Sequence, residues 1–183
     1  MTIARSMTAD ELLVLPKGKD RYELVKGELI TLPPAGEEHG EIANNISFLL
    51  TAFIRANQLG KTYAAETGFV LARDPDTVRG PDFAFVPNDR IPPGAPSKKF
   101  SKLVPALVLE VLSPGDSVIE VEEKIEDWLG FGVDEVWIAN PRRKAVTIYA
   151  TGRDPHTVRS GEVIRGSGIL AGFSHPVAEL FPG

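Results

Sequence analysis

A short apolar run with one acid in its middle constrains the fold of this chain more than any other stretch. Six of the eight residues at 107–114 are Leu, Val or Pro. A run of this length between turn-forming residues is typical of a β-strand that is buried on both faces. Because side chains alternate along a strand, Glu110 is predicted to share a face with Val108 and Leu112. Burying a lone carboxylate is unfavourable by several kcal/mol, so Glu110 requires a charged or hydrogen-bonding partner.

The composition is that of a globular protein. The chain has 183 residues, 43% hydrophobic and 25% charged, and we expect one domain over residues 1–183. It has no apolar run of membrane-spanning length and no signal core in its first residues, so we expect a cytoplasmic protein with no membrane partner. Cysteine is absent, so a metal would need carboxylate, histidine or carbonyl ligands. The net charge of −5 argues against bulk nucleic-acid binding, although an enzyme that acts on nucleic acid remains possible.

The order of the predicted elements indicates a mixed α/β or α+β domain. A two-residue turn at Lys26-Gly27 predicts an N-terminal hairpin. Apolar periodicity predicts long helices over 37–57 and 116–129, and the loop at 88–102 resembles a flap or lid. The predicted strands are 22–25, 28–32, 61–65 with a possible extension to 73, 81–86, the strand around Glu110, 135–139, 145–149, and a weaker hairpin of 156–159 with 162–165.

Asp82 is the predicted partner of Glu110. Both acids lie in apolar strands that follow each other in the chain, and such strands are often neighbours. Two adjacent carboxylates repel each other unless a cation lies between them. Mg²⁺ or Mn²⁺ would suit the two acids, the Val111 carbonyl and water, and would activate water and neutralise charge on a phosphoryl group. Lys124, at the inward edge of the second long helix, is placed to stabilise the transition state or position the attacking water.

The same residues also allow other interpretations. Asp82 can be a strand-entry residue that is bonded to the backbone. Glu110 and Lys124 can form a buried structural ion pair, or Lys124 can extend to solvent. His39, in the first turn of the first long helix, is predicted to be exposed rather than a ligand.

A set of motifs in fixed order covers nearly the whole chain from Tyr22 onward. The motifs are Tyr22-Glu23-Leu24-Val25 with Gly27-Glu28-Leu29, His39 at a helix start, Pro81-Asp82, Leu109-Glu110-Val111-Leu112-Ser113-Pro114, Lys124, and Gly132-Val133 with Glu135 and Trp137. In this order they resemble the Uma-type restriction endonuclease family, which is placed in the PD-(D/E)XK nuclease superfamily.

The resemblance implies the restriction-endonuclease-like fold, a central mixed sheet flanked by helices. It implies that Asp82 and Glu110 bind Mg²⁺ or Mn²⁺ and that Glu23 is an additional acid near the metal. The usual Glu-x-Lys motif would place lysine at position 112, but this chain has Leu112 there, and Lys124 in the following helix matches the displaced lysine. The resemblance also implies a nucleic-acid partner, DNA in the first place, and assembly into dimers or larger oligomers.

Two functions of different classes follow. The first is a metal-dependent endonuclease that uses Asp82, Glu110, the Val111 carbonyl and Lys124. The second is a non-catalytic relative that keeps the fold for binding or assembly. A glycosidase with Asp82 and Glu110 as acid and base is a third option, which the low aromatic content of 8% disfavours.

Overall fold

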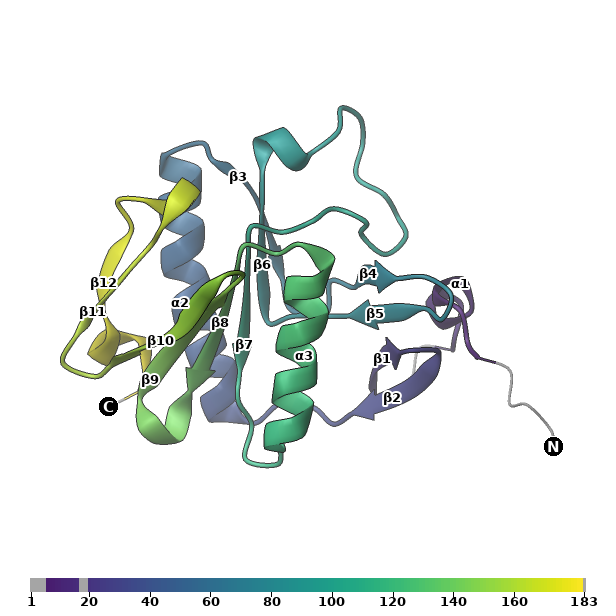
Figure 1. Cartoon of the computed structure of the whole chain (residues 1–183), viewed down its shortest axis with the longest axis horizontal. Coiled ribbons are helices and arrows are strands. Elements are labelled where there is room, and N and C mark those ends of the chain that lie inside the picture. The colour runs from purple at the N-terminus through teal and green to yellow at the C-terminus, as the bar shows by residue number, and fades with distance from the viewer. Residues whose placement is uncertain (1–5, 17–19, 183) are drawn as a thin grey trace.

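The structure is a computed structural model that describes residues 6–16 and 20–182 (Figure 1). In these residues a six-stranded sheet with the order β10-β9-β8-β7-β6-β3 forms the centre. Strands β7 and β8 run parallel, and the other neighbours in this sheet are antiparallel. The central sheet is therefore mixed, as predicted. Its strands are β3 (Gly60–Ala64), β6 (Phe83–Pro87), β7 (Leu107–Val111), β8 (Glu135–Asn140), β9 (Ala145–Ala150) and β10 (Arg153–Arg159).

Helices α2 (Glu37–Ala56) and α3 (Val118–Phe131) cover opposite faces of the central sheet; in Figure 1, α3 lies in front and α2 behind. The alternation along the strands decides which side chains meet which helix. The α2 side holds the buried cluster Ile42, Ile46, Leu50, Ile54, Phe83, Phe85, Leu107, Leu109 and Val111. The α3 side holds Ala84, Val86, Val108, Ile125 and Trp128. The predicted alternation of the strand at 107–111 is confirmed.

Helix α3 begins with a capping box. The Ser117 side chain accepts a hydrogen bond from the Glu120 N–H, and the Glu120 side chain accepts one from the Ser117 N–H. The helix ends at Gly132, which has a φ of 100° that favours glycine. Val118, the first residue of α3, is 73% exposed. It lies in the first turn, and the buried α3 side chains begin further along at Ile125.

The N-terminal hairpin belongs to a second sheet, with the order β2-β1-β5-β4. Its turn at Lys26-Gly27 has φ values of 50° and 82°, as the two-residue connection requires. The predicted extension of the strand at 61–65 to residue 73 is wrong, because β4 pairs with β5 in this second sheet. The strands of this sheet are β1 (Arg21–Val25), β2 (Glu28–Leu32), β4 (Phe69–Ala72) and β5 (Thr77–Arg79).

The C-terminal strands differ from the predicted hairpin of 156–159 with 162–165. Strand β10 pairs with β9 at the edge of the central sheet, and β11 (Val163–Arg165) pairs with β12 (Ser174–Pro176). The hydrogen-bonding groups of β10 are thus taken up by the sheet edge. The remaining elements are short helices: α1 (Ala9–Leu13), η1 (Asn88–Arg90), η2 (Pro141–Arg143), η3 (Gly168–Leu170) and η4 (Val177–Leu180).

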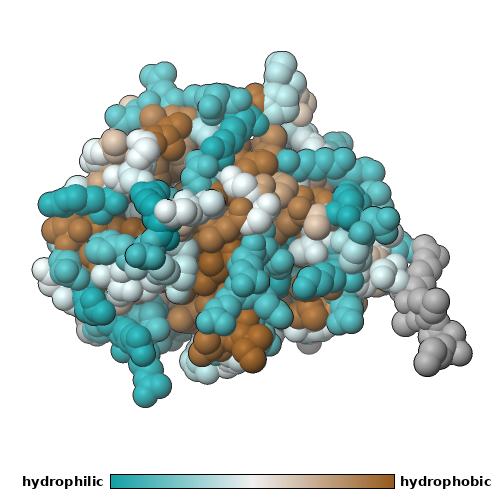
Figure 2. Space-filling view, in the orientation of Figure 1, coloured by the Kyte–Doolittle hydropathy of each residue, from teal (hydrophilic) through white to brown (hydrophobic). Residues whose placement is uncertain are grey.

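The surface is largely hydrophilic with several hydrophobic areas, as Figure 2 shows for one face. The start of α3 carries two exposed apolar side chains, Val118 and Ile119, which are 73% and 69% exposed. By contrast, Trp128 and Trp137 are fully buried. Among the helices that the structure describes, none has the length and apolar character needed to cross a membrane.

Candidate active site

Asp82 and Glu110 come from two neighbouring antiparallel strands of the central sheet, Asp82 from the residue just before β6 and Glu110 from β7. Strand β6 pairs with β7 so that Phe83 lies opposite Leu109; Asp82 directly precedes β6, and Glu110 lies within β7. The Asp82 N–H donates to the Leu109 carbonyl at 3.0 Å, one position away from the β6–β7 register, in which Leu109 is paired with Phe83. The Asp82 carboxylate accepts a hydrogen bond from Val111, the residue after Glu110, so the two acids lie near each other at this end of the sheet.

One oxygen of Asp82 is held by the protein itself. Its Oδ2 accepts a hydrogen bond from the Val111 N–H at 2.8 Å and lies 3.2 Å from Nε2 of His39. The backbone bond agrees with the interpretation of Asp82 as a strand-entry residue. Among the described residues, none donates a hydrogen bond to Oδ1, so this oxygen can serve a ligand while Oδ2 keeps the side chain in place.

His39 lies in this site, and its predicted exposure is wrong. Its side chain is 11% exposed, because the first turn of α2 sets it beside Asp82. The hydrogen bond to Asp82 raises the pKa of His39 above the usual 6.5, while burial opposes the rise. A hydrogen bond with the Val111 backbone also favours the protonated ring. The motif order contained His39, but no spacing rule connects a helix start to a strand so far along the chain.

Glu110 has two partners, both from α3. Trp128 donates its Nε1 proton to Oε1 at 2.9 Å, and Nζ of Lys124 lies 3.8 Å from Oε2. Burial raises the pKa of Glu110 from its usual 4.5 to about 7. The positive charge of Lys124 opposes this rise, and the negative charges of Asp82 and Glu23 add to it. The like charge of Asp82 is thus felt at Glu110, as expected for two acids in one site.

Lys124 remains a charged amine. The negative charge of Glu110 raises the pKa of Lys124 above its usual 10.5, although burial opposes the rise. The side chain is 26% exposed, so one end of this ion pair reaches solvent. A charged amine at this position can stabilise negative charge on a substrate, whereas it cannot accept a proton. The interpretation of Lys124 as a purely solvent-directed side chain does not hold.

Glu23 lies beside the acid pair, but both of its oxygens are taken. Oε2 accepts a hydrogen bond from Nη1 of Arg79 at 2.9 Å, and Oε1 accepts one from the Gly80 N–H at 3.0 Å. The residue is 3% exposed. Its negative charge acts on Glu110. In this arrangement Glu23 is a fixed charge near the site.

Two cavities have residues of this region in their walls. The larger, of about 430 Å³, contains His39 and Asp82 in its wall. The smaller, of about 210 Å³, contains Glu23, Arg79 and Gly80. Arg21 lines both cavities.

The donor set at this centre fits a hard divalent cation. Asp82 and Glu110 offer carboxylate oxygens, and Val111 offers a backbone carbonyl, which are the ligand types that Mg²⁺ and Mn²⁺ prefer. The effect of Asp82 on the pKa of Glu110 marks two like charges that a cation would offset. In the part of the chain that the structure describes, no group of three or more His, Asp and Glu side chains has a metal-binding arrangement. The two-acid, one-carbonyl set does not require such a group.

Comparisons with known proteins give a family and a fold. The family model described as "Uma2: Putative restriction endonuclease" matches residues 9–178. A crystal structure of a "putative nuclease belonging to DUF820" from Anabaena variabilis is 21% identical, with a TM-score of 0.83, and covers 96% of this chain and 97% of that chain. At this identity the similarity concerns the fold, and it confirms the predicted restriction-endonuclease-like architecture. No curated protein matches this chain. The match over 9–178 means that the chain belongs to the Uma2 family of putative restriction endonucleases, as the motif order predicted.

Proposed function

We propose that this protein is a metal-dependent endonuclease that hydrolyses phosphodiester bonds in DNA. The observation that supports the proposal most directly is the meeting of two acids and an amine: Asp82 bonds to the Val111 N–H beside Glu110, and Nζ of Lys124 lies 3.8 Å from Glu110. A cytoplasmic location and a dimer are part of the proposal. The exposed apolar side chains of Val118 and Ile119 at the start of α3 offer surface for such an assembly.

The proposed metal ligands are Asp82, Glu110 and the Val111 carbonyl. A Mg²⁺ or Mn²⁺ ion held there supplies Lewis-acid stabilisation of charge on the phosphoryl oxygens. His39 holds Asp82 through Oδ2 at 3.2 Å and so leaves Oδ1 for the ion. The Trp128 indole fixes Glu110 through Oε1 in the same way. Such second-layer contacts set the orientation of ligands before the ion binds.

In the proposed reaction, water adds to phosphorus while the bond from phosphorus to the leaving sugar oxygen breaks. The attacking water gives its proton to solvent, and the leaving oxygen takes a proton from solvent. The Lys124 ammonium stabilises the negative charge that grows on a non-bridging oxygen of the phosphoryl group. Because Lys124 comes from α3, it performs this role without a lysine at position 112.

Metal titration and a cleavage assay test the proposal together. We expect the wild-type protein to bind Mn²⁺ in calorimetry and to cut DNA in the presence of Mg²⁺ or Mn²⁺, and we expect chelation of the metal to stop the cutting. Asp82→Ala should bind no metal. If the variant changes stability alone and no DNA or RNA is cut in Mn²⁺, the non-catalytic alternative is correct, in which the fold serves binding or assembly.

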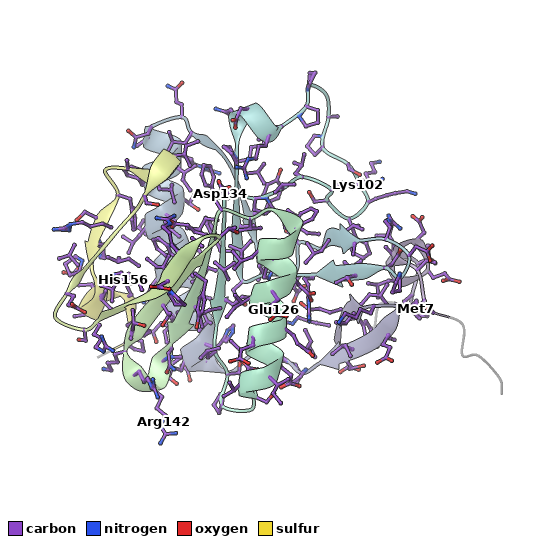
Figure 3. The ribbon with its side chains drawn as sticks, viewed as in Figure 1. Met7, Lys102, Glu126, Asp134, Arg142 and His156 are labelled. Atoms are coloured by element: carbon purple, nitrogen blue, oxygen red, sulfur yellow. The ribbon has the colours of Figure 1, made fainter. Side chains whose placement is uncertain are left out.

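Replacing Lys124 with methionine is expected to slow cleavage by about 10²-fold at saturating DNA, because the transition-state charge loses its nearby ammonium. Methionine keeps the apolar stem that packs beside Glu110. The measurement is the single-turnover rate in Mn²⁺. Lys102→Met, on an exposed loop (Figure 3), is the charge-matched control and should keep the wild-type rate. Equal rates for the two variants would remove Lys124 from the mechanism.

A further inference from the structure

Two arginines lie beside the acidic centre, and their partners differ. Arg79 gives its Nη1 proton to Glu23 at 2.9 Å, and its Nε and Nη2 protons to Asp127 at 3.0 and 2.7 Å. Arg21, two residues before Glu23 on the same side of β1, has no such partner. Its Nε is the one buried side-chain nitrogen or oxygen without a hydrogen bond in the part of the chain that the structure describes.

The missing partner is unusual for such a group. A buried donor without an acceptor is unfavourable by about 1–3 kcal/mol, and native proteins contain few of them. Asp20 and Glu66 line the smaller cavity together with Arg21, yet neither forms an ion pair with it among the described residues. Arg21 is therefore a cation that lies near several acids but forms no ion pair with any of them among the described residues.

The position of Arg21 connects the two cavities. It is in the wall of both, with Glu23 on one side and with His39 and Asp82 on the other. Its positive charge reaches His39, where it opposes the rise in the pKa of that ring. Arg21 is thus near the Asp82–His39 pair and open to a ligand in either cavity.

We propose that Arg21 binds a backbone phosphate adjacent to the one that is cut, and thereby positions the DNA strand across Asp82 and Glu110. This inference rests on the proposed function. The planar guanidinium matches two phosphate oxygens at once, which an ammonium does not. A phosphate bound beside Arg21 would supply an anionic partner for a guanidinium that forms no ion pair with the nearby acids among the described residues. It would also enter a region that Glu23, Asp82 and Glu110 make negative, where an anionic strand needs a fixed cation.

The larger cavity has room for the strand on the far side of Arg21. One wall is formed by α2, where a Cβ added to Gly40 would meet nothing within 4 Å. The α2 residues that line this wall share small or short polar side chains: Gly40, Ala43, Asn44, Ser47 and Thr51. A sugar-phosphate chain that leaves Arg21 can therefore run along α2 without displacing large side chains.

The test compares Arg21→Ala, Arg21→Lys and Arg142→Ala. Arg142 lies at the tip of the turn between β8 and β9 and points away from the protein (Figure 3), so it serves as the control. The probe is a fluorescein-labelled DNA duplex of about 20 base pairs in Mn²⁺-free buffer. Arg21→Ala should raise the Kd about tenfold or more and reduce the slope of log K against log salt by about 1. Arg21→Lys should restore the slope but not the full affinity.

Kinetics and stability separate the possible outcomes. With cleavage in Mn²⁺, Arg21→Ala should raise KM more than it lowers kcat, because it removes binding common to ground and transition states. Its melting temperature should stay at or above that of the wild type, since Nε loses no hydrogen bond. An unchanged Kd and salt slope would overturn the role of Arg21 while leaving the nuclease proposal intact. A wild-type protein that neither binds nor cuts DNA would overturn both.

Discussion

The Glu110→Gln variant should be more stable than the wild type at alkaline pH and at the same time unable to cut DNA. The pKa of Glu110 is about 7 in the folded protein and has its usual value of 4.5 when exposed. Between these values the folded state holds a proton that the unfolded state has released. The stability of the wild type therefore falls as pH rises from about 4.5 to about 7, by about 3 kcal/mol in total. Glutamine keeps an acceptor for Trp128 and carries no charge, so the variant avoids this loss.

Urea unfolding of both proteins at about pH 5 and about pH 8 without metal measures the effect. We expect similar stabilities at the lower pH and a more stable variant at the higher pH. Mn²⁺ should then stabilise the wild type and leave the variant unchanged. Cleavage should fall by about 10³-fold, because a metal ligand contributes more than the outer-layer partners that alone give 10–100-fold. Glu126→Gln, on the exposed side of α3 (Figure 3), is the control and should change neither property.

The sign of the stability change separates two interpretations of Glu110. If the acid exists to form a structural ion pair with Lys124, removing its charge leaves a partly buried ammonium without a partner and the variant is less stable. If the role of the acid is to bind a cation, its charge destabilises the metal-free protein, and the variant is more stable. A less stable Glu110→Gln protein at alkaline pH, with normal cleavage, would contradict the metal site.

The second large effect is expected at Arg79. Replacing it with methionine should destabilise the protein by about 3–5 kcal/mol, the usual result when one partner of a buried ion pair is removed. The Arg79 side chain is 6% exposed and its partner Glu23 is 4% exposed. Asp127, its other partner, is 22% exposed and can still reach water. The measurement is the free energy of unfolding in urea at neutral pH.

The matched control is a surface pair of the same chemistry. Lys99 and Asp10 form an ion pair 3.1 Å long with side chains 69% and 64% exposed. Lys99→Met should change the stability by no more than about 1 kcal/mol. A second variant with both Glu23→Gln and Arg79→Met should recover part of the loss, because no unpaired charge remains. If Arg79→Met costs no more than Lys99→Met, Glu23 is not held as a buried charge and is free to act as an acid in the site.

The part of the site that lies on strands was predictable from the sequence. A single acid in an apolar run predicts that Glu110 lies in a buried strand. The alternation of side chains along β7 then places Glu110 on the face that α3 covers. Asp82 follows because antiparallel neighbours in the chain tend to pair. Lys124 follows from helical spacing, because its helix must lie over the strand that precedes it.

The rest of the site depends on contacts between distant segments, for which a local pattern carries no signal. His39 lies in the first turn of α2. It is buried because this turn packs beside Asp82, the residue just before β6. Strand β5 has three residues and forms only because β1 and β4 lie on either side of it. Arg79 and Arg21 cannot be told apart from the sequence. In the structure Arg79 is paired with Glu23 and Asp127, whereas Arg21 has no ion pair among the described residues.

The parallel pair β7 and β8, joined through α3, has a consequence for how a site on this fold can diverge. Helix α3 packs over β7, the strand that precedes it in the chain. A given location beside β7 can therefore be reached by a side chain of the strand or by a side chain of the helix. In this protein Leu112 packs against the α3 side of the core. The amine near Glu110 belongs to Lys124 of α3 instead. The position of a reactive group in space can thus be kept while its position in the chain moves, provided that the loop joining strand to helix stays the same length.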